Sequence, residues 1–160
     1  MNSIPDIFTI SSQKQFEKIA LKIFRFQYEN NAVYREFCCL LNTDIQKVKS
    51  LKKIPFLPIQ FFKSHKVVSN LNPIQKTFTS SGTTGISTSK HFVTDSSLYE
   101  ESYRNGFSEF YGIAEDYVIL ALLPSYLERE GSSLIYMIDD LIKMTNNPES
   151  GFFLQNNRFF

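Results

Sequence analysis

Residues 77–90 read Thr-Phe-Thr-Ser-Ser-Gly-Thr-Thr-Gly-Ile-Ser-Thr-Ser-Lys, and this run is the most informative part of the chain. Five hydroxyl side chains and two glycines fall between Thr79 and Gly85. Gly82 and Gly85 can adopt positive φ angles, which lets the backbone approach a ligand closely. Successive backbone N–H groups in such a turn form a concave site for anionic oxygens, and the short hydroxyls add donors. The run therefore predicts a phosphate-binding loop between two strands.

Two well-known nucleotide loops do not match this run. A Walker A loop requires Lys directly after its second glycine, but Ile86 follows Gly85 here. The dinucleotide fingerprint Gly-x-Gly-x-x-Gly is missing as well. A plain turn rich in Ser, Thr and Gly is the alternative interpretation, because loops of that composition are common.

Length and composition indicate one globular domain. The chain has 160 residues, of which 42% are hydrophobic and 21% are charged, and its formal charge is +1. So small a net charge predicts no attraction to nucleic acid or anionic lipid. The longest apolar run, residues 118–123, is too short to span a bilayer, and residues 1–6 do not resemble a signal peptide. We therefore expect a cytoplasmic protein with no membrane span and no nucleic-acid partner.

The cysteines and histidines do not have the spacing of a metal site. Cys38 and Cys39 are adjacent, no Cys-x-x-Cys pair exists, and His65 and His91 stand apart from Cys or acidic clusters. We expect no metal bound by side chains, and we expect both cysteines to be structural. Apolar spacing places Cys38 on the inner side of a helix.

The first 72 residues are predicted to be mainly helical. The expected elements are a helix over 12–41 interrupted at Asn30-Asn31 and opened by a Ser12/Gln15 capping box, a short helix over 43–50, and an apolar elbow with a turn at 58–63. Residues 73–160 are predicted to be α/β, with the phosphate loop at 79–88. The expected elements there are strands over 75–80 and 90–94, a helix from Thr94 or Asp95 to Gly112, a strand over 117–123, a helix from Gly131 or Ser132 to Met144, and a strand over 151–154.

The fold class that follows is α/β, with N-terminal helices before a partial, mainly parallel sheet. Residues 117–123 are continuously apolar rather than alternating, which predicts a strand buried on both faces, as in a parallel sheet. A strand, a helix and a strand in that order form a crossover unit.

The run Ser81-Gly82-Thr83-Thr84-Gly85-Ile86 resembles the phosphate motif of the adenylate-forming enzymes, the acyl- and aryl-CoA ligases, whose usual form is Ser-Gly-Thr-Thr-Gly-x-Pro-Lys. Ser87 replaces Pro and Thr88 replaces Lys, and Thr at this last position is similar to the phenylacetate-CoA ligase branch. Ile54-Pro55-Phe56-Leu57-Pro58-Ile59, Phe62-Lys63-Ser64-His65 and Leu123-Pro124-Ser125-Tyr126 resemble the acyl-protein synthetase family, the Lux-type synthetases of bacterial luminescence and their relatives. The resemblance covers nearly the whole chain.

The resemblance implies an ATP-dependent, acyl-adenylating ligase with Mg2+. In such an enzyme a carboxylic acid, here expected to be a fatty acid, is activated as acyl-AMP and then transferred to a thiol of a protein or of coenzyme A. By the same resemblance, the phosphate cradle consists of Ser80, Ser81, Gly82, Thr83, Thr84, Gly85 and Thr88.

The later motifs of that family have no counterpart in the chain. The resemblance therefore implies the N-terminal part of one large adenylate-forming domain, truncated and inactive alone, with a missing C-terminal half or a partner subunit. The alternative is a catalytically silent fragment that binds a nucleotide or an acyl group, and the 16 Phe residues fit either an acyl pocket or simply a Phe-rich core.

Four other residues are candidates for a substrate pocket. Tyr126, Ser132 and Ser133 follow the predicted strand 117–123, and open α/β sheets bind ligands at the carboxyl ends of their strands. His65 follows the apolar elbow and is either a surface histidine or a partner of the phosphate or acyl site. The adjacent acids Asp139-Asp140 are expected on a solvated helix face.

Overall fold

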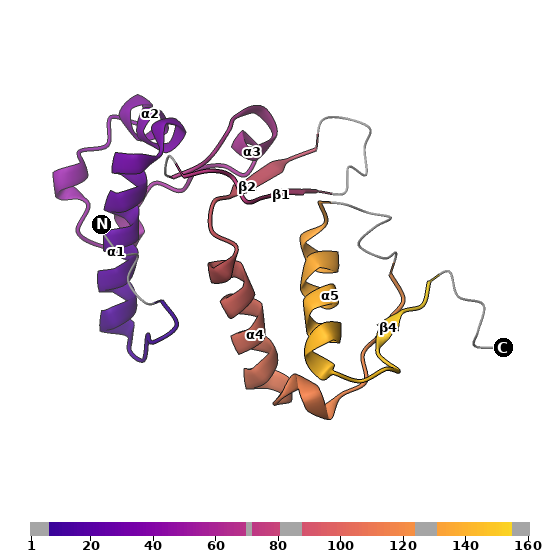
Figure 1. Ribbon diagram of the computed structural model, residues 1–160. Helices are drawn as coiled ribbons and strands as arrows, with labels where there is room; N and C mark the ends of the chain where they lie inside the picture. The colour runs from indigo at the N-terminus through magenta and orange to yellow at the C-terminus, as the bar shows by residue number, and fades with distance from the viewer. Residues whose placement is uncertain (1–6, 70–71, 81–87, 124–130, 155–160) are drawn as a thin grey trace. The chain divides into compact units, whose positions relative to one another are not determined.

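The computed structural model describes residues 7–69, 72–80, 88–123 and 131–154 (Figure 1). The chain divides into two compact units, Met1–Pro73 and Ile74–Phe160. No helix in the described ranges is long and apolar enough to cross a membrane.

The N-terminal unit is helical. Its elements are α1 (Gln13–Asn30), α2 (Ala32–Leu40), the 3-10 turns η1 (Ile45–Lys47) and η2 (Leu51–Lys53), and the short helix α3 (Phe61–Ser64). The capping prediction is partly right. Ser12 Oγ accepts from the Gln15 backbone N–H at 3.3 Å, but the Gln15 side chain accepts from the backbone of Ser11 rather than Ser12.

One buried amide forms the predicted break between the first two helices. Asn31 is only 4% exposed; its backbone N–H donates to the Gln27 carbonyl at 2.8 Å, and its side-chain oxygen accepts from the Tyr34 N–H at 3.1 Å. The same residue therefore ends α1 and caps α2. Tyr34 in turn donates its hydroxyl proton to the Pro55 carbonyl at 2.6 Å, which ties the proline elbow to the core.

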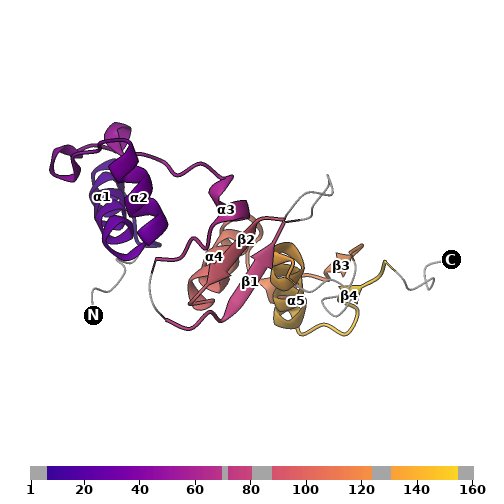
Figure 2. The same ribbon diagram turned by 90° about the horizontal axis from the view of Figure 1, so that it is seen from above.

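The described part of the C-terminal unit forms two small sheets and two long helices. Its elements are β1 (Lys76–Thr79), β2 (Lys90–Val93), α4 (Ser97–Tyr111), η3 (Ala114–Asp116), β3 (Leu120–Ala121), α5 (Ser133–Thr145) and β4 (Gly151–Phe152). β1 and β2 pair antiparallel, with Thr79 opposite Lys90, so the predicted hairpin is confirmed. β3 and β4 pair parallel on either side of α5 in the sequence, which confirms the strand–helix–strand unit. Figure 2 shows α5 beside this parallel pair.

The expected large parallel sheet is not found in the described part of the chain. The fold is mixed α/β, but its two sheets are separate and two-stranded, one antiparallel and one parallel. The prediction of a strand buried on both faces at 117–123 was wrong. Ala121 is 7% exposed, whereas Leu120 and Leu122 are 52% and 72% exposed. A two-residue strand that pairs with a single neighbour leaves part of its apolar surface exposed. The apolar run alone does not indicate how many other segments pack against the strand.

Candidate phosphate-binding site at the β1–β2 hairpin

The Ser/Thr/Gly run connects β1 to β2, as predicted. Ser80 and Thr88, its first and last predicted cradle residues, are placed by the structure. The others, Ser81, Gly82, Thr83, Thr84 and Gly85, lie outside the described residues, and so does Tyr126. The site is therefore built from the base of the loop and from what packs against it.

Two reciprocal hydrogen bonds close the base of the loop. The Ser80 backbone N–H donates to the Ser89 carbonyl at 3.1 Å, and the Ser89 N–H donates to Ser80 Oγ at 3.1 Å. A hydroxyl that accepts one bond keeps its own proton available for a second partner. Ser80 can therefore hold the loop base and still donate to an anion.

Gly131 lies against the other edge of β1. Its carbonyl accepts from the Thr79 N–H at 2.8 Å, and its φ is +85°. A Cβ atom at this position would lie 3.0 Å from Thr79 Oγ1, which is tighter than most real Cβ contacts. Only glycine combines this positive φ with this approach. Sequence reasoning saw Gly131 as a helix start and missed its contact with the strand.

The same contact brings the candidate residues Ser132 and Ser133 to the start of the loop. Ser132 is the N-cap of α5, with its Oγ accepting from the Ile135 N–H at 3.4 Å. The Ser133 carbonyl accepts from the Tyr99 hydroxyl at 3.1 Å. Figure 1 shows the start of α5 close to the end of β1.

A set of charged and aromatic contacts fixes α5 beside α4. Arg104 donates from Nε and Nη2 to the two carboxylate oxygens of Asp140, both at 2.8 Å. These bonds hold the pKa of Asp140 below its usual value. One turn away, Tyr136 donates to Glu100 at 2.6 Å, and this bond raises the pKa of Tyr136 to about 12. The bidentate Arg104–Asp140 pair fixes the orientation of the two side chains as well as the distance between them.

Phe78 connects β1 to both helices. It is 8% exposed, and its ring centroid lies 5.3 Å from that of Tyr99 on α4 and 5.7 Å from that of Tyr136 on α5. Because side chains alternate along a strand, a buried Phe78 leaves Thr77 and Thr79 on the opposite face. The strand that leads into the loop is thus anchored one residue before Thr79.

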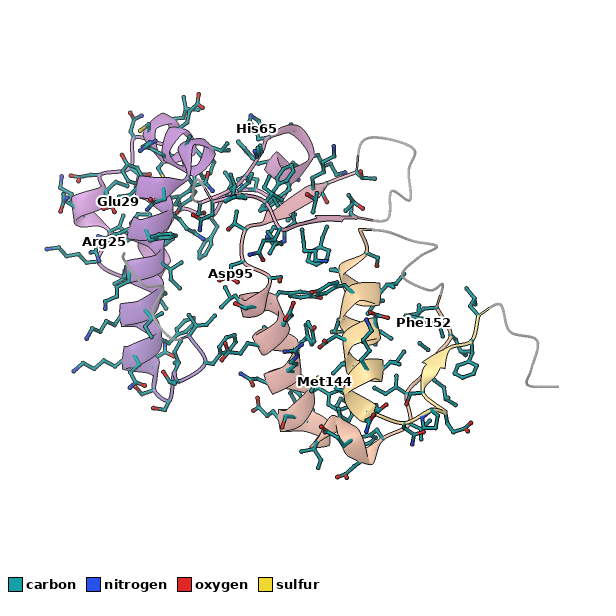
Figure 3. The ribbon with its side chains drawn as sticks, viewed as in Figure 1. Arg25, Glu29, His65, Asp95, Met144 and Phe152 are labelled. Atoms are coloured by element: carbon teal, nitrogen blue, oxygen red, sulfur yellow. The ribbon has the colours of Figure 1, made fainter. Side chains whose placement is uncertain are left out.

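His65 and the cysteines lie in the N-terminal unit. His65 caps the end of α3, stacks on Phe61 at 5.0 Å and has Ser64 Oγ 2.8 Å from its Nδ1 (Figure 3). Cys38 is fully buried, as its position in the pattern predicted, and burial raises the pKa of its thiol. Cys39 is exposed.

The side chains at the described base of the loop suit an anion. The hydroxyls of Ser80, Thr88 and Ser132 can donate hydrogen bonds to phosphate oxygens, whereas the backbone N–H groups of Thr79, Ser80 and Ser89 are already bonded within the protein. Within the described ranges, no group of three His, Cys, Asp or Glu side chains gathers as metal ligands.

Comparison with known proteins gives a consistent result for the first part of the chain. The family described as acyl-protein synthetase, LuxE, matches residues 5–97, which is more than half of the chain and includes the whole Ser/Thr/Gly run. A long-chain-fatty-acid–luciferin-component ligase of Photorhabdus luminescens is 35% identical over 75 residues. That match spans 46% of this chain and 64% of the relative. No solved structure matches the chain.

The family match covers the elements from α1 to β2, including the N-terminal helices, the proline elbow and the loop-bearing hairpin. It includes the phosphate run and the proline elbow from which the resemblance was drawn, whereas Leu123-Pro124-Ser125-Tyr126 lies outside the matched residues. The chain belongs to the LuxE acyl-protein synthetase family.

Proposed function

We propose that this chain handles ATP in an acyl-adenylating ligase that activates a long-chain fatty acid for transfer to a protein thiol. The description of the family as acyl-protein synthetases supports the reaction class and the protein acceptor. The name of the Photorhabdus relative, a ligase of long-chain fatty acids, supports the substrate. Coenzyme A is the other thiol that this chemistry would serve.

The observation that carries the proposal is the loop in its hairpin. Ser80 and Ser89 close its base, and the Gly131 backbone packs on the strand before it. Such a support fixes the two ends of the glycine-rich run, and successive N–H groups of a run of this composition can form an anion site. We assign the cradle for the β and γ phosphates to Ser80, Ser81, Gly82, Thr83, Thr84, Gly85 and Thr88.

In the proposed reaction a carboxylate oxygen of the fatty acid attacks the α phosphorus of ATP. The bond from that phosphorus to the bridging oxygen breaks, and pyrophosphate leaves with the charge of the broken bond. Donors fixed around the leaving group stabilise this charge better in the transition state than in the ground state. Thr84 and the backbone of Gly82 are the groups that we expect to act in this way.

Mg2+ would neutralise the same phosphate oxygens when it is bound with the nucleotide. The hydroxyls at the described base of the loop can donate to phosphate oxygens, and within the described ranges no group of three His, Cys, Asp or Glu side chains gathers as metal ligands. We therefore expect the ion to be held mainly by the nucleotide and by water, and the chain's own residues to orient the phosphates.

Calorimetric titration of the protein, purified from its natural host, with ATP and separately with AMP in the presence of Mg2+ tests the assignment. We expect ATP to bind more tightly than AMP, because AMP lacks the phosphates that the loop holds. Gly82→Val should remove this difference by blocking the backbone approach. Thr84→Ala should weaken ATP binding by roughly 1.5–3 kcal/mol, the range for a hydrogen bond to a charged group.

Gly106→Ala is the matched control, because Gly106 lies in α4 with no atom within 4 Å of the added Cβ. It should leave both affinities unchanged. Equal affinity for ATP in the wild type and in a folded Gly82→Val variant would refute the phosphate-loop assignment. Titration with a long-chain fatty acid alone separates an acyl-binding role from nucleotide binding.

A further inference from the structure

The net charge of +1 conceals two oppositely charged halves. Residues 1–73 hold eleven Lys and Arg against five Asp and Glu, which leaves +6. Residues 74–160 hold six against eleven, which leaves −5. The boundary between the halves is the boundary between the two compact units. At physiological ionic strength charges are screened over roughly 8 Å, so a partner responds to the local surface rather than to the total charge.

The positive charge of the first unit includes a straight row on α1. Lys14, Lys18, Lys22 and Arg25 follow one another at intervals of one helical turn, and all four are exposed. Residues at this spacing share one helix face, and the row is about 16 Å long at 1.5 Å per residue. No salt bridge within the described ranges joins any of the four to a carboxylate. We call these four residues the basic row; Figure 3 shows Arg25 extending away from the helix.

The inner face of α1 limits which class of partner the basic row can bind. Phe24 is 2% exposed and packs edge-on against Tyr34, with ring centroids 6.2 Å apart. Phe24 is therefore held by the protein's own core and is not available to insert into a lipid surface, and Phe16, which is 47% exposed, is the one large apolar side chain that α1 leaves exposed among the described residues. The basic row contains no aromatic residue on which a nucleic-acid base could stack. An acidic protein surface is the remaining class of partner for the basic row.

The second unit carries such a surface. Glu101 and Glu109 on α4, with Glu115 and Asp116 in the following turn η3, are all exposed and form no salt bridge among the described residues. Arg104, the basic residue of this helix, is already paired with Asp140. Glu101 and Glu109 are eight positions apart, about 12 Å along the helix, which is the separation of Lys14 and Lys22. We call these four acids the acidic group.

We propose that two copies of this chain associate in solution through the basic row of one copy and the acidic group of the other. Every copy carries both surfaces, so the basic row of one copy can meet the acidic group of another. Complementary charge of this kind mainly steers encounter and sets register, and its effect declines as salt rises. The proposal does not depend on the nucleotide function.

Sedimentation velocity over a range of protein concentrations tests the association. At low ionic strength, about 0.05 M, we expect a species larger than the monomer. At about 0.5 M salt, where the screening length falls to a few ångström, association should weaken roughly tenfold or more. A wild type that stays monomeric at every concentration overturns the proposal, and so does association that is insensitive to salt.

Charge reversal identifies the surfaces. The triple variant Lys14→Glu, Lys18→Glu, Lys22→Glu should be monomeric by itself. The control Lys49→Glu, Lys52→Glu, Lys53→Glu makes the same charge change at exposed positions of the same unit and should associate like the wild type. Equal loss of association in both variants would mean that total charge, rather than the basic row, is responsible, and would overturn the assignment.

Mixing two reversed variants gives the decisive result. Glu101→Lys, Glu109→Lys should also be monomeric by itself, because its acidic group then holds two basic and two acidic residues and no longer attracts the basic row. When it is mixed with the Lys14/Lys18/Lys22 variant, each surface again meets its opposite, and association should return. Circular dichroism verifies that both variants are folded. A mixture of folded variants that remains monomeric overturns the proposal.

Discussion

Gly131 shows how one residue can contact a strand that is distant in the sequence. It lies 52 positions after Thr79 in the sequence, yet its carbonyl accepts the Thr79 N–H at 2.8 Å. The left-handed φ and the missing Cβ allow this approach, and the start of α5 is placed beside the end of β1 as a result. The residue is thus a support for the candidate site rather than part of its cradle.

Gly131→Ala is expected to lower the free energy of unfolding by about 1–3 kcal/mol, because a side chain is strained at this φ and would contact Thr79. Gly106→Ala is the control: it places the same methyl group in open space within a helix and should be neutral or stabilising by up to ~1 kcal/mol. Urea denaturation measures both. Equal stability of the two variants would show that the close approach at Gly131 has no energetic consequence.

At the residue scale, helix breaks and caps could be predicted from the local sequence, whereas contacts between residues far apart in the sequence could not. The break at Asn31, the cap at Ser132 and the stop at Gly112 were predicted from side-chain chemistry, and the structure confirms them. The Asp139-Asp140 pair was expected on a solvated face. Asp140 instead pairs with Arg104 from another helix, which no local pattern encodes.

The contact between α4 and α5 is the element-scale feature that supports the site. A double-mutant cycle of Arg104→Gln and Asp140→Asn should give a coupling energy of about 1–2 kcal/mol, because the pair is bidentate and only partly exposed. The control cycle, Lys143 with Asp139, joins more exposed partners within one helix and should give roughly 0.3–0.5 kcal/mol. Similar coupling in the two cycles would argue against a special role for the interhelical pair.

The same pair predicts a pH dependence. The hydrogen bonds from Arg104 lower the folded-state pKa of Asp140, so the carboxylate stabilises the fold above its unfolded pKa of about 4 and loses this effect as pH falls through the folded value. The stability difference between the wild type and Asp140→Asn should therefore be constant near pH 7 and shrink below about pH 4. A difference that is the same at every pH would mean that ionisation of Asp140 does not contribute.

Helices and strands were predicted correctly where the local sequence has strong signals. The prediction failed where the length of a strand depends on the segments that pair with it. The hairpin was expected at 75–80 and 90–94 and is found at Lys76–Thr79 and Lys90–Val93. The strand expected over 117–123 is only Leu120–Ala121, with one side exposed. Apolarity there indicated a strand, but the size of the sheet depends on pairing between distant segments.

At the scale of the whole molecule, a short motif was more informative than any average property. The order of residues in 81–86 indicated the family that the comparison then found over residues 5–97. Net charge, by contrast, gave no sign of the division into a basic and an acidic half. The candidate site could be predicted as a loop, but not its support by Gly131 and Phe78, which depends on tertiary contacts.

Exchange of labelled pyrophosphate into ATP is the most direct test of the proposal that the Ser/Thr/Gly loop serves acyl-adenylation. It should be measured on the protein as its host produces it, with long-chain fatty acid and Mg2+. We predict exchange that requires the fatty acid, is abolished in Gly82→Val and is retained in Gly106→Ala. Exchange at the wild-type rate in a folded Gly82→Val protein would contradict the account.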